Sequence, residues 1–217
     1  MRVSVLIPTF RRPASFLRAA HSVFAQRGVA DIELVAVDNS PEGSALATFA
    51  GLADSAPIPF RFAHCPAPGV ANARNAALRL ARGDLIAWLD DDEEAAPDWL
   101  SALIAQRLAT GAQSVFGPVQ ARAEATTRFA PFFESLYSRR GPSTDARNTR
   151  AWGVGNSLQP RAMFDEAEAF DAEANETGGE DDRLFATWAD AGAAFAWAAD
   201  AVVVEHIGPE RTRVIYG

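Results

Sequence analysis

Short apolar runs alternate with segments of helical periodicity along the first half of the chain. The runs are rich in β-branched and aromatic residues and are too short for helices, so we predict that they are strands. The predicted strands are residues 3–7, 32–37, 60–63, 85–89 and 114–116. Between them, apolar residues recur every three or four positions, which favours amphipathic helices. The predicted helices are residues 13–26, 44–53, 69–81 and 97–110.

This alternation predicts an α/β fold with a mostly parallel, Rossmann-like sheet and helices on both faces. The carboxyl ends of parallel strands lie along one edge of such a sheet, and ligands bind outside that edge. Thr9, Asp38 and Asp90 each stand at the end of a predicted strand. We therefore expect these three residues to converge. Gly83 follows the third predicted helix, where a left-handed C-cap is expected.

The second half of the chain is less regular. Residues 121–150 are predicted to be a long loop with a short helix at 132–138, and such loops often form functional lids. Residues 180–191 have a helical pattern, and 195–198 and 202–204 are predicted to be short strands. The chain shows neither an internal repeat nor a linker, so we expect one domain.

Composition narrows the class of protein. Of the 217 residues, 48% are hydrophobic and 22% are charged, as in ordinary soluble globular proteins. The net charge of −8 argues against nucleic acid as a partner, because phosphate backbones need clustered cations. All 20 basic residues are arginine, which excludes mechanisms that need a Schiff-base or P-loop lysine. The single cysteine, Cys65, excludes an internal disulfide and indicates a reducing cytoplasm. We expect neither a signal peptide nor a transmembrane helix.

Five adjacent acidic residues, Asp90–Glu94, follow a predicted strand at the edge where ligands bind. One interpretation is a solvated loop that caps the helix beginning at Pro97. The other is a divalent metal site, because hard carboxylate oxygens suit Mg²⁺ or Mn²⁺. Such an ion would neutralise a nucleoside diphosphate that leaves when a sugar–phosphate bond breaks. Residues 153–155 begin like a dinucleotide fingerprint, but Leu158 stands where its last glycine belongs.

Five segments resemble, in order, the motifs of the family-2 glycosyltransferases. They are Val3–Arg12, Val37–Ser40, Gly69–Asn75, Leu89–Glu93 with Pro97, Trp99 and Leu100, and Gly178–Asp181. Each motif is weak alone, and their order makes the resemblance specific. It runs from about residue 3 to residue 206, nearly the whole chain. The detail is most similar to bacterial exopolysaccharide glucosyltransferases of the succinoglycan type.

The resemblance implies a GT-A fold and an inverting hexosyltransferase that uses a nucleoside-diphosphate sugar, with a UDP-sugar favoured. It implies one domain, residues 1–217, with a nucleotide-binding half of about 1–119 and an acceptor-binding half of about 120–217. The acidic cluster would be a DXD motif that holds Mn²⁺ or Mg²⁺. The acceptor would be a saccharide or a lipid-linked saccharide in exopolysaccharide or cell-surface synthesis. We expect a bacterial, cytoplasmic protein with at most peripheral contact with the inner face of the cytoplasmic membrane.

The resemblance also assigns candidate site residues. Those expected to bind the donor nucleotide are Pro8, Thr9, Phe10, Arg11, Asp38, Arg74, Asp90 and Asp91. The expected metal ligands are Asp92, Asp91 and His206. Asp181 and Glu180 are the expected catalytic residues, with Asp181 as the base and Glu180 supporting the acceptor. The expected acceptor-binding residues are Trp152, Asn156 and Glu180. Arg183 departs from the family, which often has a second acid at this position.

Each assignment has a structural alternative. Asp38 could cap the turn that follows it, and Arg74 could be a solvated helix residue. Asp181 and its acidic neighbours could be acids favoured by a helix N-terminus. His206 could be a buried structural histidine, and Trp152 could pack in the core.

Two other functions stay open at this point. A nucleotidyltransferase that makes the sugar nucleotide shares the expected architecture, but it usually has a glycine-rich loop after the first strand, and Pro8–Arg11 contains no glycine. A non-catalytic nucleotide-binding module could keep the fold without turnover. The intact acidic cluster and the Glu180-Asp181 pair argue against that reading.

Overall fold

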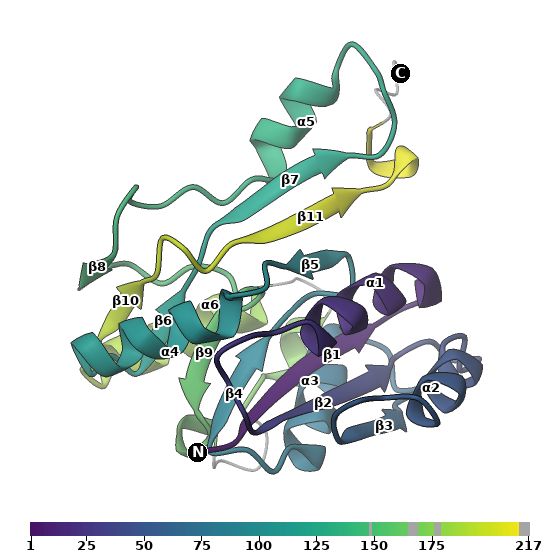
Figure 1. The fold of residues 1–217 in the computed structure, drawn as a ribbon, viewed down its shortest axis with the longest axis horizontal. Coiled ribbons are helices and arrows are strands. Elements are labelled where there is room, and N and C mark those ends of the chain that lie inside the picture. Colours follow the sequence, from purple (N-terminus) through teal and green to yellow (C-terminus); the bar gives the residue numbers. More distant parts are fainter. Residues whose placement is uncertain (148, 165–168, 176–178, 213–217) are drawn as a thin grey trace.

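The computed structural model describes residues 1–147, 149–164, 169–175 and 179–212. Within these residues, six α-helices pack around a large mixed sheet and a smaller three-stranded sheet (Figure 1). The helices are α1 (Pro13–Phe24), α2 (Leu46–Ala53), α3 (Val70–Leu80), α4 (Trp99–Thr110), α5 (Ala130–Tyr137) and α6 (Glu180–Asp190). None of the helices in the described part of the chain is long and apolar enough to cross a bilayer.

The larger sheet has the strand order β3-β2-β1-β4-β9-β6-β10-β8. Its strands are β1 (Val3–Thr9), β2 (Ile32–Asp38), β3 (Phe60–His64), β4 (Leu85–Trp88), β6 (Ser114–Phe116), β8 (Ala146–Arg147), β9 (Ser157–Pro160) and β10 (Phe195–Trp197). The first four neighbours are parallel, as the sequence pattern predicts, and β6 is parallel to β10. β9 is antiparallel to both β4 and β6, and β8 is antiparallel to β10, so the second half of the chain makes the sheet mixed.

The smaller sheet has the order β5-β11-β7. It consists of β5 (Glu93–Ala95), β7 (Val119–Ala123) and β11 (Val203–Ile207). β7 and β11 run side by side, with β5 on the other side of β11, and α5 lies along β7 (Figure 1). The short helix predicted at 132–138 is confirmed as α5, but the segment predicted as a loop around it also contains the end of β7 and the short strand β8. Three short 3₁₀ helices complete the described chain: η1 (Arg161–Phe164), η2 (Ala172–Asn175) and η3 (Pro209–Thr212).

The strand β1 is buried on both faces, which explains its nearly continuous apolar sequence. Val3, Val5 and Ile7 point into one hydrophobic cluster with α1 and α4, and Leu6 points into another on the opposite face. The second cluster is rich in aromatic rings; its fully buried members include Trp88, Trp197, Phe116 and Phe170. Each fully buried side chain of this size contributes roughly 1.5–3 kcal/mol.

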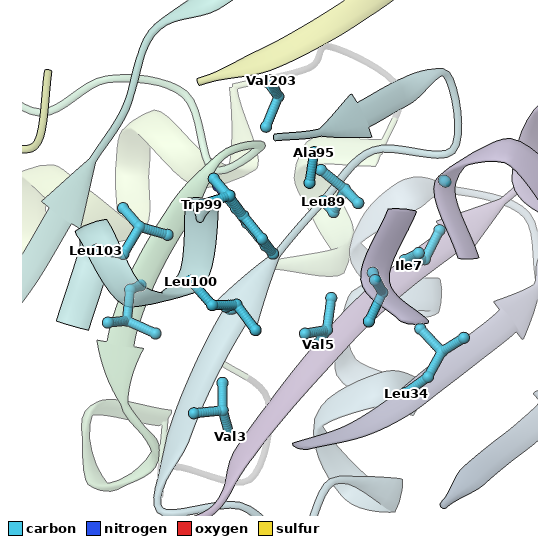
Figure 2. Close-up of a cluster of buried hydrophobic side chains, with 14 of the residues drawn as sticks. Val3, Val5, Ile7, Leu34, Leu89, Ala95, Trp99, Leu100, Leu103 and Val203 are labelled. Atoms are coloured by element: carbon cyan, nitrogen blue, oxygen red, sulfur yellow. The ribbon is translucent and has the colours of Figure 1, made fainter. Parts of the chain in front are cut away.

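The first cluster also joins the small sheet to the large one. Figure 2 shows Val203 of β11 and Ala95 of β5 close to Leu89 and Trp99. Since Leu89 immediately precedes the acidic cluster, this packing fixes where that cluster leaves the core.

Gly83 does not adopt the predicted left-handed cap. Helix α3 ends at Leu80, and the extended backbone of Ala81 (φ −63°, ψ 142°) stops it. Gly83 instead approaches β1 so closely that a Cβ would lie 2.5 Å from the Ser4 backbone nitrogen. The glycine is needed for this approach, which the Gly83 N–H uses to donate to Ser4 Oγ at 2.8 Å.

The strand ends converge as predicted. Thr9 pairs with Asp38 in the register of β1 and β2. Thr9 Oγ1 also donates to Asp91 Oδ2 at 2.6 Å, although 82 positions separate the two residues. The carboxyl edge of the parallel strands is therefore where the acidic cluster lies.

Candidate active site

A pocket of about 740 Å³ opens at the carboxyl edge of the parallel strands. The pocket wall is formed by the end of β1, the loop after β4 and the start of α3, together with residues of α5, β7, β11 and η3. Its charged and polar residues include Thr9, Arg12, Asn39, Arg74, Asp90, Asp91, Asp92, Glu93, Tyr137, Arg139, Glu205 and Arg211. Four arginines and five carboxylates among the described residues give a wall suited to an anionic ligand that binds together with a cation.

Asp91 is tied to the end of β1. Its Oδ2 accepts hydrogen bonds from Thr9 Oγ1 at 2.6 Å and from the Phe10 N–H at 3.4 Å, and its Oδ1 pairs with Arg12 Nη1 at 3.2 Å. Burial raises the pKa of Asp91 to about 6, and the bond from Thr9 opposes that rise. Pro8, Thr9 and Phe10 all line the pocket, on the side predicted to bind the donor.

Asp92 lies between two arginines. Its Oδ2 accepts from Arg12 Nη1 at 2.7 Å and from Arg211 Nη1 at 2.9 Å. Arg211 also pairs with Glu205 at 2.8 Å and stacks on Tyr137, with Cζ 4.3 Å from the ring centroid. Burial, and then repulsion from Asp92, raise the pKa of Glu205, although Arg211 opposes them. Segments from both ends of the chain therefore meet at one carboxylate.

Asp90 and Glu93 form the inner part of the acidic cluster. Glu93 is 3% exposed, and its Oε2 accepts the Asp90 N–H at 3.0 Å. Burial raises the pKa of both carboxyl groups; Arg74 opposes this for Asp90 and Arg139 for Glu93. Glu93 therefore shapes the loop from inside and does not belong to a solvated acidic run.

Arg74 of α3 and Glu180 of α6 form a buried ion pair. Their side chains are 9% and 7% exposed, and Arg74 Nη1 donates to Glu180 Oε1. The guanidinium also lies 5.4 Å from the centroid of Phe170. Arg74 is thus not a solvated helix residue, and it lines the pocket. Its contact with a nucleotide stays a prediction. Glu180 has a partner inside the protein in place of the predicted acceptor contact.

Asp181 stands in the first turn of α6, directly after Glu180. Its Oδ2 accepts the Val154 N–H at 3.0 Å, from the loop before β9. Burial is the main cause of the raised pKa of Asp90, and the charge of Asp181 adds to it, so the two carboxylates share one electrostatic environment. A position in the first helical turn suits either a base or a dipole-stabilising acid. Gly178, the first residue of this predicted motif, lies outside the described residues.

The loop before β9 is anchored from two sides. Arg139 Nη1 donates to the Gly155 carbonyl. Asn156 has a positive φ of 52° and is fully buried. Its Nδ2 donates to two backbone carbonyls at 2.8 Å, and its Oδ1 accepts from Trp99 Nε1 at 2.7 Å. The structure therefore replaces the predicted acceptor contact of Asn156 with an anchoring role.

Two residues predicted to bind the donor point elsewhere. Arg11 pairs with Glu42 at 2.7 Å, and its side chain is 57% exposed. Asp38 is fully buried, and its two carboxylate oxygens accept the N–H groups of Ser40 and Ala45 at 2.8 and 2.6 Å. This geometry corresponds to the turn-capping alternative for Asp38.

His206 and Trp152 also lie away from the pocket. The His206 ring bonds to Glu94 at 3.0 Å. Because successive strand residues point to opposite faces and Glu205 lines the pocket, the ring of His206 lies on the other face of β11. Trp152 packs against Trp197, with ring centroids 4.9 Å apart, as its core-packing alternative predicts.

Arg12 ends the first segment that resembles a family motif, but the sequence assigned it no role. Three further charged pocket residues lie outside those segments: Arg139, Glu205 and Arg211. No local pattern marks them, because each reaches the pocket through the tertiary fold. The available signal was charge. Five adjacent carboxylates at a sheet edge need cations, and Arg12 stands in the first segment that resembles a family motif.

The donor set of the pocket fits a divalent cation that a ligand helps to hold. Within the described residues, no group of three or more His, Cys, Asp or Glu side chains is arranged as a metal site. Mg²⁺, however, takes only one or two protein carboxylates and completes its shell with phosphate oxygens and water. Asp92 and Glu205 both pair with Arg211, so their carboxylate oxygens lie close to each other and could bind the cation. His206, a predicted ligand, lies on the wrong face of β11 for this role.

Comparison with known proteins places these features in a family context. The sequence model of Glycosyl transferase family 2 matches residues 4–167. Succinoglycan biosynthesis protein ExoM of Rhizobium meliloti (strain 1021) is 30% identical over 223 residues, which cover 100% of this chain and 70% of that protein. Succinoglycan biosynthesis protein ExoO of the same strain is 33% identical over 111 residues, or 51% of this chain and 31% of that protein.

Solved structures share the fold. S. aureus TarS 1–349 superposes with a TM-score of 0.72 at 14% identity, covering 95% of this chain. Its complex with UDP gives a TM-score of 0.74 at 14% identity, covering 97% of this chain. The chain spans 60% and 62% of the lengths of these two TarS structures.

Proposed function

Because this chain belongs to Glycosyl transferase family 2, we propose that it transfers a hexose, with inversion, from a nucleoside-diphosphate sugar to an acceptor hydroxyl. The observation that carries the proposal is the pocket at the carboxyl edge of the sheet. Its wall contains Thr9, the acidic cluster and Arg74, and Arg74 pairs with Glu180, the residue directly before Asp181.

The relatives favour particular substrates. TarS has been solved with UDP and with UDP-GlcNAc, which supports a UDP-sugar as the donor. ExoM and ExoO are succinoglycan biosynthesis proteins, which supports a saccharide acceptor in exopolysaccharide or cell-surface synthesis. A lipid-linked saccharide acceptor would bring the enzyme to the inner face of the cytoplasmic membrane.

In the proposed reaction, Asp181 is the general base. The acceptor oxygen attacks C1 of the sugar from the face opposite the diphosphate and gives its proton to the Asp181 carboxylate, while the bond from C1 to the diphosphate oxygen breaks. The Val154 N–H holds Asp181 Oδ2 in place at 3.0 Å. The buried pair of Arg74 and Glu180 fixes the start of α6, and with it the direction of Asp181.

The departing diphosphate gains negative charge, and the pocket supplies cations for it. A divalent ion at Asp92, when bound, would neutralise part of this charge and orient the phosphates. Asp91 would support that ion or the donor ribose. The side-chain hydroxyl of Thr9 holds Asp91 Oδ2 at 2.6 Å and so keeps this carboxylate at the pocket wall.

Paired substitutions of adjacent acids test the proposal. Asp181→Asn keeps the size of the side chain but removes the base, so sugar transfer should fall by about 10²–10⁴-fold while UDP binding persists. Asp182→Asn is the matched control, because Asp182 is the next residue and is exposed. Transfer is followed as UDP released from a panel of UDP-sugars with Mn²⁺ and saccharide acceptors, and binding is followed by thermal stabilisation.

Three outcomes would count against the proposal. Full transfer by Asp181→Asn would remove Asp181 from the role of base. Loss of both transfer and UDP binding in that variant would show that Asp181 supports the donor site. Release of pyrophosphate from a nucleoside triphosphate by the native protein would favour a nucleotidyltransferase.

A further inference from the structure

The arginines that line the pocket in the described part of the chain fall into two groups. Arg74 pairs with buried Glu180, and Arg139 donates to a main-chain carbonyl of the loop before β9. These two are fixed by the packing of the fold. Arg12 and Arg211 bond to carboxylates of the acidic cluster and of β11, and 42% and 26% of their side-chain surfaces are exposed.

Arg12 and Arg211 meet at a single oxygen atom. Asp92 Oδ2 accepts from Arg12 Nη1 at 2.7 Å and from Arg211 Nη1 at 2.9 Å. Arg12 extends to Asp91 at 3.2 Å, and Arg211 extends to Glu205 at 2.8 Å. Two guanidinium ions this close repel each other, so several negative charges must surround them. A diphosphate supplies such charges, and its oxygens match the planar fork of arginine.

Both arginines are held at the pocket by contacts that do not involve Asp92. Arg12 is the N-cap residue of α1, three positions after the end of β1, so its backbone is fixed beside the acidic cluster. Arg211 stacks on the ring of Tyr137 at 4.3 Å. Each side chain can therefore exchange Asp92 for another anion and still face the pocket.

We propose that Arg12 and Arg211 form the diphosphate-binding pair of this pocket, and that both exchange Asp92 for phosphate oxygens when Asp92 takes a divalent cation. The proposal rests on the proposed function, in which the donor is a nucleoside-diphosphate sugar. It assigns the arginines two effects of opposite sign. They compete with a cation for Asp92, and they stabilise the diphosphate that binds beside that cation.

The opposite signs make a sharp test. Arg12→Ala and Arg211→Ala each remove one competitor from Asp92, so Mn²⁺ alone should bind more tightly than to the native protein. The same variants lose charge-assisted hydrogen bonds to the diphosphate, so UDP at saturating Mn²⁺ should bind about 10-fold more weakly or worse. UMP, which lacks the second phosphate, should lose less affinity than UDP.

Arg18→Ala is the matched control. Arg18 lies on α1, pairs with Glu124 at 2.9 Å and has the same exposed fraction, 42%, as Arg12. The Arg18→Ala substitution removes one half-exposed arginine that has no bond to the acidic cluster. The affinity for Mn²⁺ is measured from the free Mn²⁺ signal in electron paramagnetic resonance, and the affinities for UDP and UMP are measured by titration calorimetry. Thermal unfolding checks each variant. Arg12→Lys and Arg211→Lys keep the positive charge but lose the paired N–H donors of the guanidinium. They are used in place of the alanine variant if that variant fails to fold.

The outcomes separate the two proposals. Weaker UDP binding with tighter Mn²⁺ binding in both variants, and native behaviour in Arg18→Ala, would support the arginine pair. Equal losses for UDP and UMP, or Mn²⁺ binding that is unchanged or weaker, would overturn it while the native protein still binds UDP. A native protein that binds no UDP with Mn²⁺ would overturn the donor site itself, and with it the proposed function.

Discussion

The buried ion pair between Arg74 and Glu180 gives the largest stability effect that we expect from one substitution. Glu180→Gln keeps the side-chain volume but removes the carboxylate that is bonded to the buried Arg74 guanidinium. Breaking a buried pair from one side typically costs about 3–5 kcal/mol. Arg74 also stacks on Phe170 and is 9% exposed, so we expect about 2–4 kcal/mol of lost unfolding free energy. In a chain of 217 residues this lowers Tm by about 4–16 °C.

Arg74→Met should cost more than Glu180→Gln. The Arg74 charge opposes the burial that raises the pKa of Asp90. Removing it leaves Glu180 without its bonded arginine and leaves Asp90 with Arg139 as the opposing charge. The double variant Arg74→Met, Glu180→Leu replaces the pair with apolar groups and should recover much of the lost stability. A double-mutant cycle from urea unfolding, followed by circular dichroism and tryptophan fluorescence, measures the coupling.

The exposed pair of Arg11 and Glu42 provides the comparison, because its side chains are 57% and 49% exposed. Substituting either partner should cost less than about 1 kcal/mol. The reasoning would be refuted if Glu180→Gln cost no more than this surface substitution. It would also be refuted if the two single effects simply added in the double variant.

Two further predictions concern glycine and pH. Gly155→Ala places a Cβ 2.5 Å from Asp90 Oδ2, so it should destabilise the protein by about 1–3 kcal/mol and weaken UDP binding. The control Gly51→Ala adds a Cβ in open space within α2 and should stabilise the protein by about 0.4–1 kcal/mol. Equal effects of the two substitutions in thermal melts would contradict this prediction. Burial acts to raise the pKa of Glu33, but hydrogen bonds from Ser4, a backbone N–H and Arg61 outweigh it and lower the pKa. The stability that Glu33 contributes is complete above the ordinary glutamate pKa of about 4.3 and is lost as pH falls through the lower pKa of Glu33 in the folded protein. The difference in the free energy of unfolding between the native protein and Glu33→Gln, measured by urea unfolding, should therefore narrow from pH 5 to pH 3. A constant difference would contradict this prediction.

The first half of the fold was predictable because each element there carries its own signal. The strands β1, β2 and β4 are almost wholly buried, so their apolar runs reflect burial on both faces. Proline at the start of α1 and repeated apolar positions in α3 and α4 mark the helices. The rule that parallel strands present their carboxyl ends together then placed Thr9 beside the acidic cluster.

The second half lacked such signals. β9 lies in the middle of the larger sheet, yet Ser157 and Gln159 are fully buried polar residues on it, and Pro160 ends it. This strand has no apolar run, and its alternation covers only four residues with Leu158 as the one aliphatic side chain, which is too short to predict a strand. β5 was hidden because its first two residues, Glu93 and Glu94, belong to the acidic run, and Glu93 is buried through its bond to a backbone N–H.

The residues of the candidate site also divide into those with a local sequence signal and those that only the tertiary fold brings to the pocket. Residues next to strand ends, such as Thr9 and Asp91, were found from local pattern and resemblance. The partners of Asp92 were not, because Arg12 and Arg211 stand 80 and 119 positions away from it. Asp38 shows the reverse error: its turn-rich sequence already described the role that its buried carboxylate has in the structure.

The place of β9 between β4 and β6 has a consequence for how the chain can come apart. β6 belongs to the first 119 residues, yet its neighbours in the sheet are β9 and β10, which come from the remainder. A fragment that ended at residue 119 would contain a strand with no partner on either side. Strands from residues 1–119 and from the rest of the chain thus alternate in this part of the larger sheet. Unfolding of either part must therefore expose strand edges of the other part. The pocket residues at the end of β1 and the loop before β9 are therefore parts of one cooperative unit.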